Sequence, residues 1–129
     1  MPTTAAELVS RARSQVDNLT VDEVSTAARN GALLVDVREP AELDAIGMIP
    51  GAVHAPRGML EFWADPVNPH HRPELDPGRR TVVYCASGAR SALAAQLLRQ
   101  LGYADAGHLD GGIEGWIRAG HPVVSPERA

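Results

Sequence analysis

The chain has 129 residues, a length typical of a single domain that buries its own core without disulfide staples. Its one cysteine excludes an intrachain disulfide and a cysteine-based zinc cluster, and we expect neither a metal nor a cofactor. The net charge is −4 and all 12 cationic side chains are dispersed arginines, so the basic patch of a nucleic-acid binder is missing.

The N-terminal segment 1–7 lacks the basic and apolar regions of a signal peptide. No apolar run approaches the length of a membrane-spanning helix, so we expect no membrane contact. An unpaired thiol fits a reducing compartment better than an oxidising one. Together these observations favour the cytoplasm.

Two capping boxes predict two helices near the N-terminus. Thr4 and Glu7 open the first, an amphipathic helix over about residues 5–17. Thr20 and Glu23 open the second, which Asn30-Gly31 ends. The first helix could pack against its own domain or against another subunit, so the oligomeric state stays open.

The next segment alternates between buried strands and short connections. Residues 32–37 form an almost continuous apolar run, as in a strand buried on both faces. Pro40 lies early in a short helix that follows, and the turn 49–52 leads into a short strand at 53–55.

Residues 56–80 form a long irregular segment with five prolines. A loop of this length in a compact domain is usually functional or packed on itself. We expect Leu60, Phe62 and Trp63 to anchor it, and it is either a lid over a site or a docking surface. The pair His70-His71 is either solvated or involved in catalysis or docking.

The last third predicts strand, helix, strand and helix in turn. The strand covers 81–85, the helix 90–101 has its leucines on one face, a short strand covers 106–109, and a final helix covers 113–119. Ile113, Trp116 and Ile117 are expected to be core residues of that helix. Strands that alternate with helices favour an α/β domain with a largely parallel sheet.

Cys85 stands at the end of a buried strand, where a short loop of small residues leads directly into a helix. Backbone N–H groups of such a loop and of the helix N-terminus point at the sulfur and stabilise a thiolate or a bound anion. The alternative is a small buried hydrophobic residue. Asp36 also ends a strand, and because parallel strands present ligands at their carboxyl ends, we expect Asp36, Arg38 and Cys85 to meet there.

Four stretches together resemble a single-domain rhodanese. They are Leu34-Val35-Asp36-Val37-Arg38-Glu39 with Glu42-Leu43, Ile49-Pro50-Gly51-Ala52, Cys85-Ala86-Ser87-Gly88-Ala89-Arg90-Ser91, and Leu109-Asp110-Gly111-Gly112-Ile113-Glu114-Gly115-Trp116 with Gly120-His121-Pro122-Val123. The resemblance implies a rhodanese-like α/β fold, a five-stranded mostly parallel sheet with helices on both faces. It divides the chain into a helical extension at 1–17, the domain at 18–124 and a tail at 125–129.

The resemblance also implies a sulfurtransferase. In that family a cysteine takes a sulfane sulfur from a small donor such as thiosulfate and passes the persulfide sulfur to cyanide, a small thiol or a protein thiol. By motif, Cys85 is the nucleophile, and the anion cradle is Ala86, Ser87, Gly88, Ala89, Arg90 and Ser91. Loop N–H donors would serve both stages without an external base.

Three charged residues have two readings each. Arg90 either binds the anion or ties the loop to a nearby carboxylate. Asp36 is expected to be a structural acceptor for loop N–H groups or an Arg rather than an acid–base group. Arg38 pairs with Glu42 or Asp36, or lines the mouth of the site.

The sequence departs from the family pattern in three places. Met48 stands where many members have His, Arg90 is the only cation of the loop, and the segment 56–80 is longer than in a minimal domain. The sparse charge weakens the case for thiosulfate as the physiological donor.

Three alternatives to the small-molecule sulfurtransferase remain. A persulfide carrier that docks a protein partner is the strongest. A cysteine phosphatase or arsenate reductase would need five residues between Cys and Arg, and only four lie between Cys85 and Arg90. A non-catalytic interaction module would typically lack the cysteine.

Overall fold

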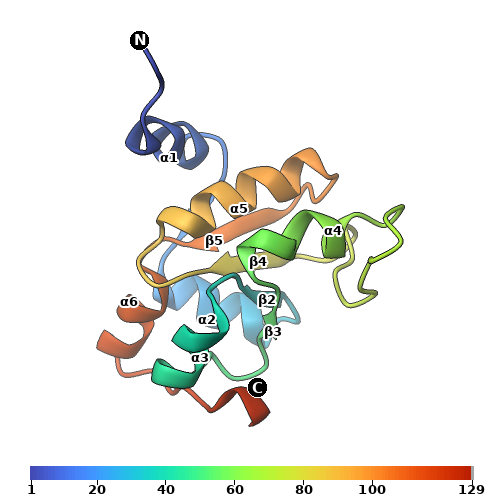
Figure 1. Ribbon diagram of the computed structural model, residues 1–129. Coiled ribbons are helices and arrows are strands. Elements are labelled where there is room, and N and C mark those ends of the chain that lie inside the picture. Colours follow the sequence, from blue (N-terminus) through green and yellow to red (C-terminus); the bar gives the residue numbers. More distant parts are fainter. Residues whose placement is uncertain (129) are drawn as a thin grey trace.

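The computed structural model describes residues 1–128 and contains one sheet of five parallel strands (Figure 1). The strands are β1 (Asp17–Leu19), β2 (Leu33–Asp36), β3 (Val53–His54), β4 (Thr81–Tyr84) and β5 (Ala106–Leu109), in the spatial order β1-β5-β4-β2-β3. The strands β2, β4 and β5 are buried on both faces, as the apolar runs predicted. The expected α/β fold with a mostly parallel sheet is therefore confirmed.

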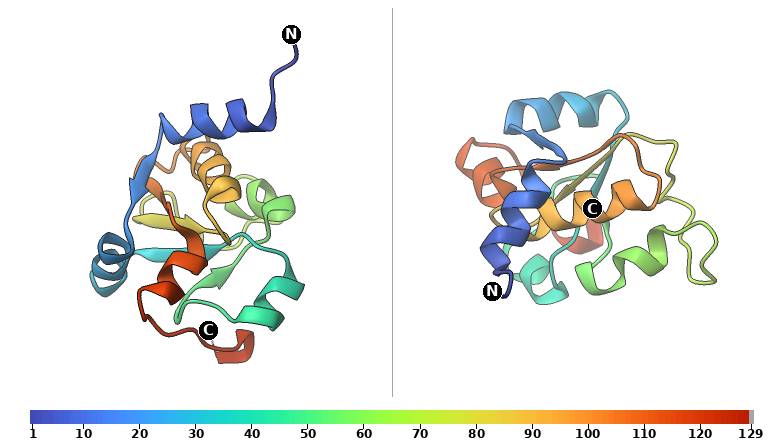
Figure 2. Two further views of the ribbon diagram at one scale, coloured as in Figure 1. Left: turned by 90° about the vertical axis from the view of Figure 1, so that its left-hand side faces the viewer. Right: turned by 90° about the horizontal axis from the view of Figure 1, so that it is seen from above.

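Helices cover both faces of the sheet, as Figures 1 and 2 show. On one face lie α4 (Leu60–Ala64) and α5 (Ala89–Gln100), with α1 (Ala5–Arg13) packed on α5. On the other face lie α2 (Val21–Arg29), α3 (Pro40–Ile46) and α6 (Gly112–Arg118). The part of the chain that the structure describes also contains two short 3₁₀ turns, η1 (Arg57–Met59) and η2 (Pro126–Arg128).

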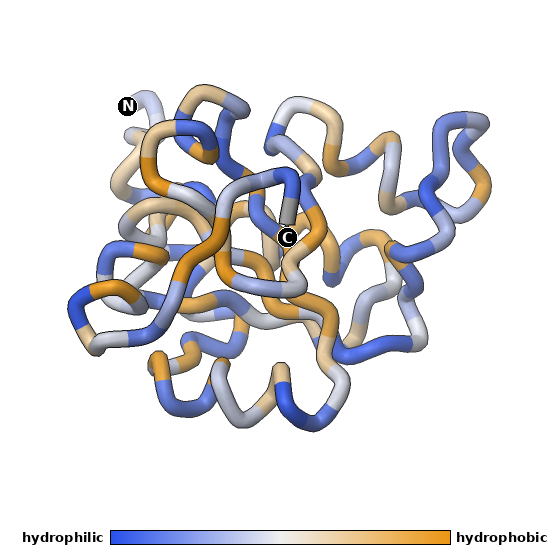
Figure 3. The backbone as a smooth tube through the Cα atoms, turned by 90° about the horizontal axis from the view of Figure 1, so that it is seen from below, coloured by the Kyte–Doolittle hydropathy of each residue, from blue (hydrophilic) through white to orange (hydrophobic). Residues whose placement is uncertain are grey.

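The two hydrophobic cores divide the strand residues between them by the alternation of side chains along a strand. Leu33, Val35 and Val83 face the α5 side, whereas Leu34 and Val82 face the α2–α3–α6 side. Figure 3 shows hydrophobic stretches in the interior, whereas the loop between α4 and β4, which projects on the right, is mainly hydrophilic.

The capping residues act as the sequence predicted. Thr4 with Glu7 and Thr20 with Glu23 each form a complete capping box, and Pro40 begins α3. Helix α1 packs against α5 of the same chain.

The N-terminal region differs from the prediction at its end. Helix α1 stops at Arg13 rather than near residue 17. Residues Asp17–Leu19 form β1, a strand that the residue pattern did not predict. This strand is short, mostly exposed and polar, so it carries no period-two hydrophobic pattern. Its pairing with β5 alone makes it a strand, with Asn18 opposite His108.

Candidate functional site

Cys85 lies directly after β4, at the carboxyl edge of the sheet. Its strand neighbour β2 ends in the same register, because Asp36 pairs with Tyr84. The two strand ends that the sequence singled out therefore meet in space, as expected. The Cys85 side chain is only 1% exposed, so its sulfur is reached through the loop that surrounds it.

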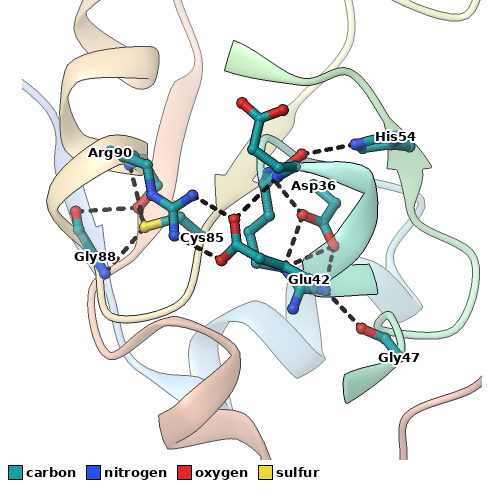
Figure 4. Close-up of polar contacts among 10 residues, drawn as sticks. Asp36, Glu42, Gly47, His54, Cys85, Gly88 and Arg90 are labelled. Atoms are coloured by element: carbon teal, nitrogen blue, oxygen red, sulfur yellow. Dashed lines mark hydrogen bonds and ion pairs between the residues drawn. The ribbon is translucent and has the colours of Figure 1, made fainter. Parts of the chain in front are cut away.

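The loop after Cys85 aims backbone donors at the sulfur (Figure 4). The Gly88 N–H donates to Cys85 Sγ at 3.1 Å, and the Ser91 N–H donates to it at 3.4 Å. Gly88 is the N-cap of α5, with a positive φ of 112° that glycine adopts without strain. The Cys85 sulfur therefore lies where a helix N-terminus stabilises negative charge.

The turn between β5 and α6 holds this loop in shape. The N–H groups of Ile113 and Glu114 donate to the carbonyls of Cys85 and Ala86 at 2.9 and 3.2 Å. Gly112 has a φ of +66°, and a Cβ there would collide with the carbonyl of Ala86. Helix α6 thus binds two carbonyls of the loop, while the amides of Gly88 and Ser91 donate to the sulfur.

Arg90 forms a bidentate ion pair with Glu42 of α3. The Arg90 Nη1 and Nη2 atoms donate to the Glu42 carboxylate at 2.7 and 2.9 Å. The hydrogen bond from Arg90 lowers the pKa of Glu42 to about 2, so the carboxylate stays ionised. Figure 4 shows the Arg90 guanidinium between Cys85 and Glu42. The loop is thus tied to a carboxylate, while the cation remains beside the sulfur.

Asp36 and Arg38 form a buried ion pair. Their side chains are 0% and 1% exposed, and Arg38 Nη2 lies 2.7 Å from Asp36 Oδ2. The backbone N–H of Arg38 also donates to Asp36, and Arg38 Nη2 donates to the carbonyl of Gly47. Of the partners expected for Arg38, the structure selects Asp36 rather than Glu42.

A second set of polar side chains leads from the sulfur toward β1, the strand at one edge of the sheet. Ser91 Oγ is 3.5 Å from Cys85 Sγ and 2.8 Å from His108 Nδ1. His108 Nε2 is 2.8 Å from Asn18 Oδ1. His108 is fully buried, and both of its ring nitrogens have hydrogen-bond partners. Its contact with Ser91 was missed, because it depends on the position of α5 above β5.

A cleft of about 570 Å³ opens beside the Cys85 loop, between α3 and α6. Its walls are mainly apolar, and its charged residues include both Glu42 and Glu114. The lining consists of Arg38, Ala41, Glu42, Ala45, Ile46, Ala86, Ile113, Glu114 and Ile117. Sequence reasoning missed most of these residues, because the cleft is made by two helices that are far apart in the chain.

Ile117 corrects the prediction for the last helix. Ile113 and Trp116 are core residues, but Ile117 is 41% exposed and lines the cleft. Residues four apart lie on the same side of a helix, so Ile113 and Ile117 both face the cleft. Ile113 is buried at its base, whereas Ile117 is open to solvent.

The segment 56–80 contributes no lining residue to this cleft. Its later part leads into the start of β4, whereas Cys85 follows the end of β4 (Figure 1). His71 Nε2 lies 2.8 Å from the carbonyl of Leu75, and Arg72 stacks on Trp63 at 3.7 Å, so this part is packed on itself. His70 is exposed.

Within residues 1–128, no three His, Cys, Asp or Glu side chains lie close enough together to hold a metal ion. No helix in that same range combines the length and the apolar character needed to cross a bilayer.

Comparison with known proteins bears on the family and the fold of the chain. A family model described as the rhodanese-like domain matches residues 20–119. A sulfurtransferase of Allochromatium vinosum is 44% identical over 95 residues, which are 74% of this chain and 80% of the relative.

Two solved structures are similar over nearly the whole chain. One is a Rhodopseudomonas palustris protein of unknown function, described as a possible tyrosine phosphatase, with 36% identity, a TM-score of 0.88 and coverage of 96% of this chain and 99% of that one. The other is a polysulfide-sulfur transferase homodimer of Wolinella succinogenes, with 29% identity, a TM-score of 0.72 and coverage of 91% and 84%.

Proposed function

The chain belongs to the rhodanese-like domain family, and from that membership we propose that it transfers a sulfane sulfur through a persulfide on Cys85. The observation that carries the proposal is the pair of backbone donors, Gly88 N–H and Ser91 N–H, within 3.4 Å of the sulfur. Such donors stabilise a thiolate before the reaction and a persulfide anion after it.

The two half-reactions balance without a redox cofactor. The Cys85 thiolate attacks the outer sulfur of a donor such as thiosulfate, the S–S bond of the donor breaks, and sulfite leaves with the bonding pair. The acceptor, for example cyanide or a thiolate, then attacks the terminal sulfur of the persulfide and releases the Cys85 thiolate. The cradle Ala86, Ser87, Gly88, Ala89, Arg90 and Ser91 would hold the charge in both steps.

In this proposal Asp36 and Arg38 have a structural role and take no part in the chemistry. Both are buried and satisfied by one another, so neither is free to exchange protons with a substrate. Their pair ties the end of β2 to the carbonyl of Gly47, directly after α3.

A persulfide carrier that delivers sulfur to a protein thiol is the second candidate. The apolar cleft beside the loop favours it, because Ile46 and Ile117 on its walls are 51% and 41% exposed. Exposed apolar side chains around a reactive centre are typical of surfaces that bind a partner. The need to keep Cys85 reduced would suit a cytoplasmic location.

Phosphatase chemistry is less favoured, despite the phosphatase description of the R. palustris neighbour. Only four residues separate Cys85 from Arg90, which leaves a narrow loop. Arg90 is also engaged by Glu42 in a bidentate pair. A tetrahedral phosphate ester would need a wider cradle and a free guanidinium.

Intact mass spectrometry tests the proposal directly. Incubation with thiosulfate or polysulfide should add the mass of one sulfur to the wild type, and cyanide should remove it as thiocyanate. Cys85→Ser should gain nothing. A wild type that gains no sulfur from either donor, or a Cys85→Ser variant that gains as much, would refute the proposal. Turnover of a phosphate ester that Cys85→Ser abolishes would favour the phosphatase instead.

A further inference from the structure

A chain of side-chain hydrogen bonds leads from Cys85 away from the cleft, toward the edge of the sheet. It runs from Cys85 Sγ to Ser91 Oγ at 3.5 Å, from Ser91 Oγ to His108 Nδ1 at 2.8 Å, and from His108 Nε2 to Asn18 Oδ1 at 2.8 Å. Cys85, Ser91 and His108 are all buried. Three strands and a helix meet to build it, since Asn18 lies on β1, His108 on β5, Cys85 after β4 and Ser91 on α5.

The surroundings of Asn18 determine where the hydrogens lie. Asn18 Nδ2 donates to the carbonyls of Arg13 and Val16 at 2.9 and 3.3 Å. The amide oxygen of Asn18 must therefore face His108, and because it only accepts, His108 Nε2 carries the proton. In the neutral imidazole, Nδ1 is then left as an acceptor.

The Ser91 hydroxyl determines the direction of the remaining hydrogen bonds. Its hydroxyl has one proton and two acceptors within reach, His108 Nδ1 at 2.8 Å and the carbonyl of Gly88 at 3.1 Å. Donation to Gly88 would leave Nδ1 of a buried ring without a donor, which is costly. When the hydroxyl donates to Nδ1, the lone pairs of Ser91 Oγ are free to accept from the Cys85 thiol.

The charges around His108 favour its neutral form. Burial lowers the pKa of His108, Asp110 raises it and Arg13 lowers it. Asp110 Oδ1 is 3.8 Å from His108 Nε2, but it is also paired with Arg13 at 3.2 Å. An unprotonated Nδ1 is thus available in the resting protein.

We propose that Ser91 and His108 form a proton relay that accepts the thiol proton of Cys85, with Asn18 as the residue that selects the tautomer. The inference rests on the proposed function and deepens it. The S–H proton passes to Ser91 Oγ while the Ser91 hydroxyl proton passes to His108 Nδ1. The products are a thiolate and an imidazolium, and the proton returns by the same route when the thiol is regenerated.

This relay changes one expectation drawn from the sequence, that loop N–H donors suffice without a base. The N–H donors stabilise the thiolate once it exists, whereas His108 gives its proton a destination among buried side chains. Ser91 contacts the reacting sulfur directly, whereas His108 is a positioning residue, because it acts on the sulfur only through the Ser91 hydroxyl.

Alkylation of the single cysteine by iodoacetamide measures the relay without any sulfur donor. We expect Ser91→Ala and His108→Gln to alkylate on the order of tenfold more slowly at neutral pH. The acid-side inflection of the wild-type rate against pH should be absent from His108→Gln. His54→Gln is the matched control, because His54 lies on β3 and contacts the carbonyl of Arg38 at 2.7 Å rather than Ser91. It should behave as the wild type.

Asn18→Asp provides a variant at an exposed position that should fold. A carboxylate facing Nε2 stabilises the imidazolium, so the inflection should move to higher pH. Unchanged rates and pH profiles in folded Ser91→Ala and His108→Gln, or an unmoved inflection in Asn18→Asp, would overturn the relay. Because alkylation is read separately from persulfide formation, the relay could stand even if the wild type accepts no sulfur.

Discussion

Glu42→Gln tests how the ion pair at the mouth of the site controls the use of anionic donors. Glu42 holds both terminal nitrogens of Arg90 at 2.7 and 2.9 Å, so the only cation of the loop is neutralised by a carboxylate. Glutamine keeps the shape and the oxygen that accepts from the Glu39 N–H at the start of α3. The substitution therefore removes one negative charge and the hydrogen bond between Arg90 Nη2 and the second carboxylate oxygen, because an amide NH₂ cannot accept from a guanidinium.

The size of the effect follows from the charges. At a separation of about 6 Å and an effective dielectric constant of about 40–80, one negative charge repels a dianion by about 1–3 kcal/mol. The side chains of Arg90 and Glu42 are 40% and 32% exposed, so salt and water reduce this to about 1 kcal/mol. That corresponds to an increase of about fivefold in kcat/KM with thiosulfate.

The assay is thiocyanate release from thiosulfate and cyanide at two ionic strengths. The gain in Glu42→Gln should shrink at high salt, and it should be absent with a neutral organic trisulfide as donor. Glu114→Gln is the control, because Glu114 lines the same cleft but its carboxylate does not contact Arg90. A variant with unchanged or lower kcat/KM for thiosulfate, or an equal gain in Glu114→Gln, would refute the role given to the pair.

Three further changes separate the scaffold from the chemistry. Asp36→Asn leaves the buried Arg38 without its counter-ion, which should cost about 3–5 kcal/mol and lower Tm by about 10–20 °C in a thermal scan. Gly112→Ala should displace the loop through the carbonyl of Ala86 and slow alkylation of Cys85. Burial lowers the pKa of His108 in the folded protein, so below the usual pKa of 6.5 the unfolded state binds more protons than the folded state. The free energy of unfolding should therefore fall as the pH drops below 6.5, and this slope should be missing in His108→Gln.

The first two of these changes have matched controls, and the third has an outcome that would contradict it. The double variant Asp36→Leu with Arg38→Met should be more stable than Asp36→Asn, since no buried charge is left alone. Gly120→Ala should cost about 1 kcal/mol and leave alkylation unchanged, because Gly120 also has a positive φ but no atom lies within 4 Å of its Cβ position. Acid denaturation that is equally steep in wild type and His108→Gln between pH 6.5 and the wild-type midpoint would contradict the third prediction.

The sequence predicted those elements whose signals are local. Both capping boxes, the helix stop at Gly31 and the buried strands β2, β4 and β5 follow from neighbouring residues, since a cap or an apolar run needs no distant partner. The strand β1 escaped detection for the opposite reason. Asp17 and Asn18 are polar and exposed, and only their pairing with β5 makes them part of the sheet.

The candidate site divides in the same way. The order Cys85, loop of small residues, helix is written in consecutive residues, and so is the prediction that N–H groups face the sulfur. Arg90 and its partner Glu42 are 48 positions apart, and the path from Ser91 through His108 to Asn18 joins residues 17 and 90 positions apart. The apolar cleft lies between α3 and α6, two helices that are far apart in the sequence. The sequence by itself determined the fold class and pointed to Cys85 as the proposed nucleophile, because the buried strands and the loop after Cys85 are written in neighbouring residues. The tertiary structure alone decided the electrostatics around that nucleophile, because charges and hydrogen bonds act across space rather than along the chain.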